Sequence, residues 1–168
     1  MKKPTVYLDT NVISAYWYEG EDQTVRTRRV ITRDWWSEES TLFSLWVSLT
    51  TLNELEAGRF RRQADCVRMA RRFRRLPITG SARQLAKDLL SSGVVPATKE
   101  ADALQMAVSA AHEMDYLLTW NYAHLANPVA QEHLEAVCRR YELRAPLVVS
   151  PETIPQHRLG QQIWRRKA

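Results

Sequence analysis

The 168-residue chain has little cysteine and no long apolar run. Its two cysteines, Cys66 and Cys138, lie far apart, without a CxxC pair or a histidine at ligand spacing. This argues against a disulfide framework and a zinc site, and it fits a reducing compartment, so we expect a cytoplasmic protein. Because no window of 18 apolar residues is present, we expect no membrane span. Asp9 and Asn11 interrupt the apolar stretch near the start, which is unlike a signal peptide.

The five glycines form no phosphate-binding loop. The glycine patterns of Rossmann and P-loop proteins are missing, so a nucleotide cofactor is not expected. The DxDxT motif of dehalogenase-like phosphatases is absent too, because Asn11 stands where its second aspartate belongs. The composition, 45% hydrophobic and 26% charged, is that of a globular domain. A chain of this length buries about 70% of its unfolded surface, so one self-standing core is expected.

Positive charge is concentrated in one stretch. Lysine and arginine total 24 against 19 acidic residues, for a net charge of +5. Residues 59–75 hold eight arginines against the single acid Asp65, a local charge of +7. Two interpretations stay open: a solvated helix face, or a surface whose guanidinium groups bind phosphate.

Apolar patterning predicts short strands that alternate with helices. Strands are expected at residues 5–8, 45–49, 76–79, 115–120 and 147–149. Helices are expected after Asn11, at residues 22–40, 50–58, 59–75, 81–91 and 99–114, and from Tyr122 onward. This alternation indicates an α/β fold, with a parallel sheet between helices. Ligands of such sheets gather at the carboxyl ends of the strands.

Oxygen-bearing side chains are predicted at this edge. Asp9 follows the first expected strand and Asn121 the fourth, while Glu54 and Asp102 lie in helices that begin near the same edge. Each fits an ordinary role as well, such as helix capping, and Glu56 competes with Glu54. Together, carboxylates at about 4 Å repel by about 4 kcal/mol per pair, so such a cluster needs protonation or a cation. Oxygen ligands alone favour Mg²⁺, with Mn²⁺ as its substitute.

Three motifs in order resemble a known family. YLDTNVIS, TTLNELEAG and EADALQMAVSAAHEMDYLLTWNYAHLAN, followed by a PET turn, are similar to PIN-domain proteins, and most to the VapC-type toxins of bacterial toxin–antitoxin pairs. The resemblance covers residues 5–153. It implies a three-layer α/β/α sandwich around a parallel sheet of about five strands, and a magnesium-dependent endoribonuclease. We therefore expect a PIN-like nuclease domain over residues 1–153 and a basic tail over residues 154–168.

The resemblance also implies site residues. Asp9, Glu54 and Asp102 match the metal-binding acids of the family. Asn121 stands where many members carry a fourth acid, so a second metal ion is in doubt, and Asn121 is expected to orient a coordinated water. Residues expected to support this pocket are Asn11 and Thr119, with Asp115 as a weaker stand-in for the fourth acid.

The resemblance further implies the partners, which are RNA, an antitoxin that blocks the acidic pocket, and a second copy of the chain in a homodimer. The arginines expected to bind RNA are Arg68, Arg71, Arg72 and Arg75. Two other classes of function stay open. Because Asn121 brings no charge, the domain could bind nucleic acid or regulate without cutting. The acidic pocket alone also does not distinguish an endoribonuclease from a flap-type DNA nuclease or a phosphatase.

Overall fold

The chain folds around one parallel sheet. The computed structural model describes residues 3–93 and 95–155, and most of the expected basic tail, residues 156–168, lies outside the described residues. The strands are β1 (Thr5–Leu8), β2 (Ser44–Ser48), β3 (Arg74–Leu76), β4 (Tyr116–Leu118) and β5 (Leu147–Val149). They pair in parallel in the order β3-β2-β1-β4-β5, which confirms the predicted α/β fold with a five-stranded parallel sheet.

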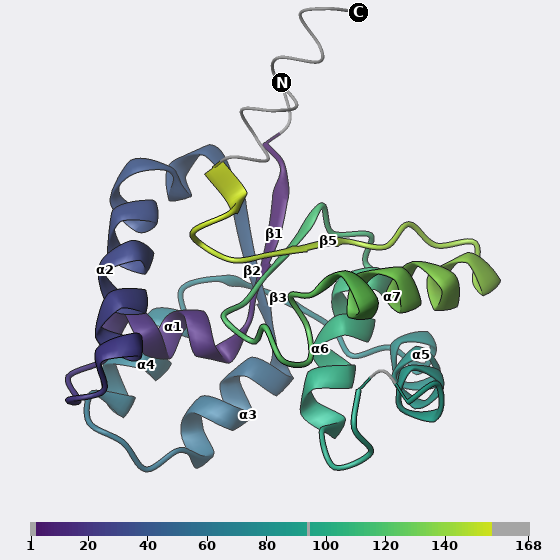
Figure 1. Cartoon of the computed structure of the whole chain (residues 1–168), viewed down its shortest axis with the longest axis horizontal. Coiled ribbons are helices and arrows are strands. Elements are labelled where there is room, and N and C mark those ends of the chain that lie inside the picture. Colours follow the sequence, from purple (N-terminus) through teal and green to yellow (C-terminus); the bar gives the residue numbers. More distant parts are fainter. Residues whose placement is uncertain (1–2, 94, 156–168) are drawn as a thin grey trace, which may run out of the picture.

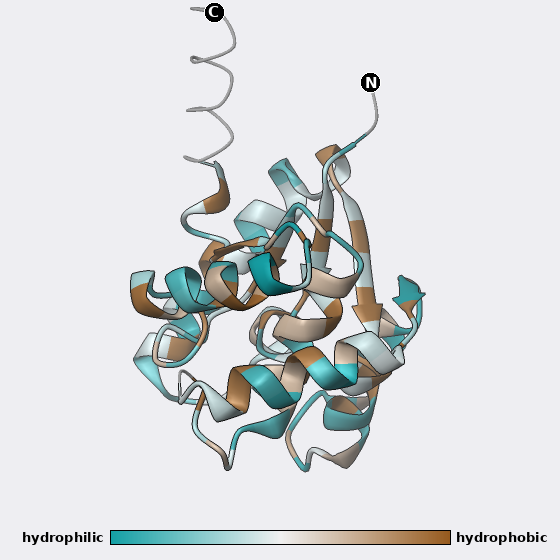
Figure 2. Cartoon of the chain, turned by 90° about the vertical axis from the view of Figure 1, so that its right-hand side faces the viewer, coloured by the Kyte–Doolittle hydropathy of each residue, from teal (hydrophilic) through white to brown (hydrophobic). Residues whose placement is uncertain are grey.

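Helices cover both faces of this sheet. They are α1 (Thr10–Trp17), α2 (Gln23–Glu38), α3 (Leu49–Ala57), α4 (Gln63–Ala70), α5 (Gly80–Ser91), α6 (Glu100–Ala111) and α7 (Pro128–Arg140). Figure 1 shows α1, α2 and α4 on the left of the sheet and α5, α6 and α7 on its right, which gives the expected three layers. Figure 2 looks onto the right-hand layer, where hydrophilic and hydrophobic residues alternate along the helices, as in helices with one buried side. No helix within the described ranges is long and apolar enough to cross a membrane.

The two central strands are buried on both faces. Val6 and Leu8 of β1 pack into the cluster beneath α1, α2 and α4, whereas Tyr7 packs with Leu117 of β4 beneath α5, α6 and α7. This alternation follows the two-residue period of a strand, and it explains why β1 reads as a continuous apolar run. The ends of β1 and β4 are thereby held side by side, with Leu8 opposite Leu118.

The prediction of a single helix over residues 59–75 is wrong. Helix α4 covers only Gln63–Ala70, and Arg62 before it has a left-handed backbone with φ of 66°. Arg74 already belongs to β3, where it pairs with Trp46 of β2 and lies 5.3 Å from the centroid of that indole ring. Pairing with β2 thus overrides the local helical pattern, and the third strand begins two residues earlier than expected. Arginines on such an edge strand also discourage pairing with other chains.

The helix after β4 begins later than predicted. Residues 122–127 form turns, and α7 begins only at Pro128. Asn127 caps α7, because its side chain accepts a hydrogen bond from Ala130 N at 2.9 Å. Proline suits the first helical position, where its missing N–H is not needed. Asn121 lies between the end of β4 and these turns, and so stays at the end of that strand.

Candidate active site

Asp9 lies buried where β1 ends. Its backbone N–H donates to Leu118 O at 3.0 Å, which ties the ends of β1 and β4 together. The side chain is 3% exposed, and it does not cap α1 although it precedes that helix. Instead, Oδ2 accepts hydrogen bonds from Thr119 Oγ1 at 2.5 Å and from Asn11 Nδ2 at 2.6 Å. The capping interpretation of Asp9 is therefore not realised.

Asn11 and Thr119 form the support around Asp9. Besides Asp9, Asn11 Nδ2 donates to Thr119 Oγ1 at 3.0 Å, and Asn11 Oδ1 accepts from Trp120 N at 2.8 Å. Both residues expected to support the pocket are thus brought to the buried acid. Their bonds fix the rotamer of the Asp9 carboxylate from two separate segments of the chain.

Helix α3 brings Glu54 to the same edge. Glu54 Oε2 accepts hydrogen bonds from Thr10 Oγ1 at 2.5 Å and from Gln105 Nε2 at 2.8 Å. The competing acid, Glu56, is exposed and forms an ion pair with Arg71 at 2.8 Å. Of the two candidates, the structure therefore brings Glu54 to the site.

Asp102 reaches the site from the first turn of α6. Its Oδ2 accepts a hydrogen bond from Asn121 Nδ2 at 3.0 Å. Asn121 Oδ1 accepts in turn from His124 N at 3.1 Å, so both polar atoms of this amide are engaged within the protein. Asn121 therefore has a turn-forming role and also holds Asp102. Its expected role in orienting water stays a prediction.

The three acids share one electrostatic environment. Burial, together with the charges of Glu54 and Asp102, raises the pKa of Asp9 to about 6, and the hydrogen bond from Thr119 opposes part of this rise. Burial also raises the pKa of Glu54, to which the charge of Asp102 adds and which the Thr10 hydrogen bond opposes. The charged form of each of these two acids is thus disfavoured while no cation is bound.

The carboxylates approach one another without yet forming a cage. Across residues 3–93 and 95–155, no three histidine, cysteine, aspartate or glutamate side chains could hold a metal ion as they stand. The roles of Asp9, Glu54 and Asp102 as metal ligands therefore stay a prediction. Yet the donor set fits a hard cation, because it consists of oxygens and carries excess negative charge. In the described part of the chain, no hydrogen bond reaches Glu54 Oε1 or Asp102 Oδ1, which leaves both oxygens available.

Asp115 lies at the other end of the strands, where β1 and β4 begin. It precedes β4, where its Oδ2 accepts hydrogen bonds from Thr5 N at 2.8 Å and Thr5 Oγ1 at 2.9 Å. Its Oδ1 accepts from Arg144 at 3.0 Å. Asp115 therefore ties together the beginnings of β1 and β4 and is not brought to the acidic site, so the expectation that it supports the pocket is not met.

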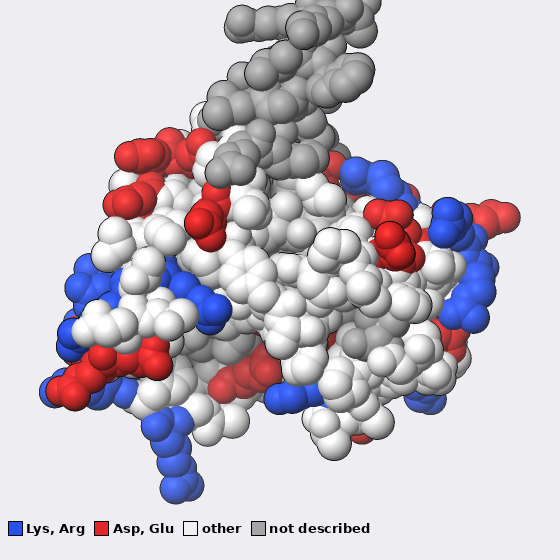
Figure 3. All heavy atoms as spheres, viewed as in Figure 1, with Lys and Arg blue, Asp and Glu red and all other residues white. Residues whose placement is uncertain are grey.

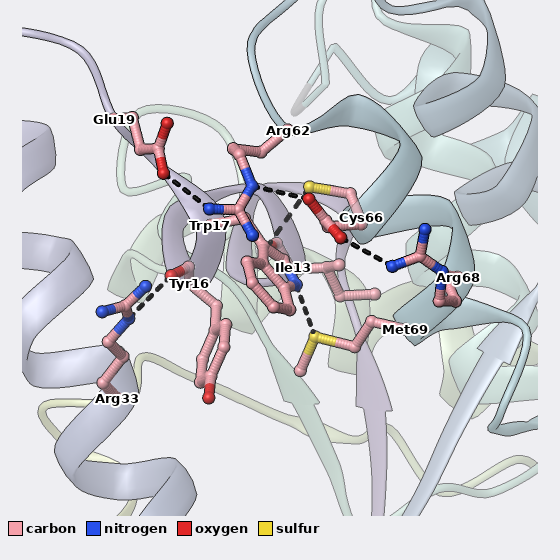
Figure 4. Close-up of polar contacts among 10 residues, drawn as sticks. Ile13, Tyr16, Trp17, Glu19, Arg33, Arg62, Cys66, Arg68 and Met69 are labelled. Carbon is pink, nitrogen blue, oxygen red and sulfur yellow. Dashed lines mark hydrogen bonds and ion pairs between the residues drawn. The ribbon is translucent and has the colours of Figure 1, made fainter.

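Much of the arginine-rich stretch is engaged in local structure. Arg62 forms ion pairs of 2.6 Å with both Glu19 and Asp65, and Arg68 binds the other oxygen of Asp65 at 2.8 Å. Figure 4 shows the contact between Arg62 and Glu19. The Arg62 guanidinium also lies 4.7 Å from the centroid of the Trp17 ring. These contacts neutralise part of the local charge before any ligand arrives.

Two of the four arginines expected to bind RNA remain uncommitted. Arg72 and Arg75 are exposed and make no ion pair within the described residues, unlike Arg68 and Arg71. Figure 3 shows acidic atoms recessed near the middle of one face, while most basic side chains lie toward its left and right margins. Acidic and basic surfaces thus occupy the same face of the molecule.

Sequence reasoning missed Gln105 and Thr10, which both bind Glu54. Gln105 stands one turn after Asp102 on a helix whose neighbouring residues are apolar. A polar residue within so apolar a run is the signal that could have marked it, because buried polar groups need partners. No sequence signal marked Thr10, because a threonine at this position is ordinary in a turn between a strand and a helix.

Comparison with known proteins gives the family. The PIN domain family model matches residues 6–127, a range that contains all four residues expected in the site. No curated protein matches the chain. FitAcB from Neisseria gonorrhoeae has a similar fold, with a TM-score of 0.52 and 12% identity over 89% of this chain and 99% of that one. VapBC2 from Rickettsia felis, in a structure bound to a promoter DNA fragment, has a TM-score of 0.48 and 11% identity, over 87% of this chain and 98% of that one. The match to the family model over most of the chain's length shows that the chain belongs to the PIN domain family, whose members are generally nucleases.

Proposed function

We propose that this protein is a metal-dependent endoribonuclease and the toxin of a toxin–antitoxin pair. The observation that carries the proposal is the buried Asp9 carboxylate, whose pKa rises to about 6 through burial and through the charges of Glu54 and Asp102. A site built in this way is stabilised by a cation. PIN nucleases generally use divalent metal ions, which supports the same conclusion.

Three carboxylates would hold the ion, which we take to be Mg²⁺ with Mn²⁺ as substitute. When bound, such an ion lowers the pKa of a water ligand and screens charge on the phosphate. Asp9, Glu54 and Asp102 supply the oxygens for this role, and each is already oriented by a donor from a different segment. Fixing ligands in advance removes the cost of ordering them when substrate binds.

Asn121 distinguishes this site from one with four acids. It contributes no charge, and its amide holds Asp102 and the following turn. We therefore propose one firmly held ion, with any second ion arriving together with the substrate phosphate. The same feature favours the second candidate function, a PIN-like module that binds nucleic acid or regulates without cutting it.

RNA is the proposed substrate, and an antitoxin and a second copy of the chain are the proposed partners. The motif resemblance to VapC-type toxins supports all three. The exposed Arg72 and Arg75 support contact with a polyanion, because guanidinium groups match phosphate oxygens. Arg68 and Arg71 would join them by exchanging Asp65 and Glu56 for phosphate.

The first prediction concerns stability in the absence of divalent ions. Folding raises the pKa of Asp9 to about 6, so its contribution to stability is full below the unfolded pKa and is lost as the pH rises through about 6. Asp9→Asn removes this loss. Between about pH 4 and about pH 8, the variant should gain about 2–3 kcal/mol of unfolding free energy relative to the wild type.

Urea unfolding in EDTA measures this difference in unfolding free energy between Asp9→Asn and the wild type. Saturating Mn²⁺ should make the difference smaller, because only the wild type keeps the Asp9 charge that a bound cation stabilises. If the difference in unfolding free energy between Asp9→Asn and the wild type does not change with pH, folding does not raise the pKa of Asp9.

The second prediction concerns cleavage. Asp102→Asn keeps the size of the side chain and an acceptor for Asn121, but it removes a charge from the proposed ion site. We expect it to lower the rate of cleavage of a structured RNA in Mg²⁺ by at least about 100-fold. Asp115→Asn, at the other end of the strands, is the matched control and should cleave at the wild-type rate.

Gel analysis of RNA and flap-DNA substrates, with Mg²⁺ or with EDTA, gives the readout. Undiminished Mg²⁺-dependent cleavage by Asp102→Asn would remove Asp102 from the mechanism. If the wild type binds nucleic acid but forms no cleavage products in either condition, the module that binds without cutting is favoured. If it cleaves the flap DNA and not the RNA, the proposed substrate is wrong and DNA replaces it.

The third prediction concerns the arginines. Replacing Arg68, Arg71, Arg72 and Arg75 by glutamine should weaken RNA binding and flatten its salt dependence, by about 0.7 in slope for each phosphate that is no longer neutralised. The pair Arg72→Gln/Arg75→Gln should account for most of the change, because these two arginines make no ion pair within the described chain. Arg139→Gln/Arg140→Gln on α7 is the control for net charge. An unchanged slope would assign the stretch another purpose.

A further inference from the structure

Gln105 is a buried amide placed between the acids. Its side chain is 1% exposed and stands on α6, one turn after Asp102. Gln105 Nε2 donates to Glu54 Oε2 at 2.8 Å, and the amide lies near enough to Asp9 to lower the pKa of that acid. One side chain thus binds the second carboxylate, lies near the first and extends from the helix that carries the third.

The other atom of this amide has no partner. Gln105 Oε1 is buried and accepts no hydrogen bond from the described residues. Turning the amide over would not help, because it would set Oε1 against the Glu54 carboxylate and remove the bond from Nε2. The acid therefore fixes which way the amide points. A buried carbonyl oxygen without a donor costs free energy, and native proteins usually satisfy it with water or a ligand.

We infer that Gln105 is a positioning residue of the proposed metal site. Its Nε2 holds the Glu54 carboxylate in place beside Asp9, and its Oε1 accepts a hydrogen bond from water in the hydration shell of the bound ion. Mg²⁺ and Mn²⁺ suit this role, since Mg²⁺ in particular keeps several of its waters in protein sites. The inference rests on the proposed function and adds to it a residue that does not itself bind the ion.

A structural role alone makes a different prediction. If Gln105 served only to fill the core, leucine of similar size would replace it with no effect on ion binding, and removing an unsatisfied oxygen would leave the fold as stable or more stable. If Gln105 positions the acids, the same substitution weakens ion binding, because orienting partners of metal ligands contribute about 10–100-fold to affinity.

The test is a Mn²⁺ titration of the full chain, followed by the EPR signal of free Mn²⁺. Gln105→Leu should raise the Kd for Mn²⁺ about 10-fold or more, while its metal-free thermal midpoint does not fall. Ser109→Ala is the matched control: Ser109 lies one turn further along α6 and is fully buried, and its hydroxyl donates to Met106 O at 2.8 Å. It should bind Mn²⁺ as the wild type does. Gln105→Met, which fills the space more flexibly, serves if the leucine variant does not fold.

The outcomes separate the inference from the proposed function. If the wild type and Gln105→Leu bind Mn²⁺ with Kd values within twofold of each other, the inference about Gln105 is wrong, whereas the proposed metal site is supported. If the wild type binds no Mn²⁺, the metal-dependent function fails and the inference fails with it. Equal weakening in Ser109→Ala would also overturn the inference, because the effect would then belong to α6 as a whole.

Discussion

Burial of the Asp9 carboxylate beside two half-buried acids is the constraint that organises one edge of this molecule. Asp9 is almost completely buried at the end of a central strand, and its pKa lies near 6 because burial and two neighbouring acids oppose its charge. Such a group is retained only where other parts of the chain hold it. The donors come from the turn after β1 and from the end of β4, so the arrangement depends on the order of strands in the sheet.

The same edge explains how the protein combines rigidity with an incomplete site. Each acid has one oxygen fastened by a hydroxyl or amide donor. Glu54 and Asp102 each keep a second oxygen that no described residue binds. Gln105 likewise keeps a buried oxygen without a donor. These unsatisfied acceptors lie among groups of excess negative charge, which a hard, hydrated cation would satisfy together.

Some of this arrangement was predictable from sequence and some was not. Short apolar runs followed by Asp9 and Asn121 predicted both the strands and their polar ends, because strand ends of a parallel sheet share an edge. The link between Gln105 and Glu54 spans 51 positions and depends on how α3 and α6 pack. Local pattern carries no information about such a pair. The arginine-rich stretch failed for a related reason, since pairing of Arg74 with β2 overrode a helical pattern.

Net charge along a stretch is also a poor measure of the charge left for a ligand. Arg62 pairs with Glu19 and Arg71 pairs with Glu56, two acids from outside the stretch, so the local excess is smaller than the sequence suggests. On one face of the molecule, Figure 3 shows acidic atoms recessed near the middle and basic side chains toward the margins.

The central claim is that Asp9, Glu54 and Asp102 bind a divalent cation together, and a crystal soaked in Mn²⁺ tests it most directly. Diffraction near the manganese absorption edge should give an anomalous peak within bonding distance of all three carboxylates, with the side chains drawn closer together than in the metal-free protein. A well-ordered crystal without a peak at that point, in which the three carboxylates keep their separate partners, would contradict the account.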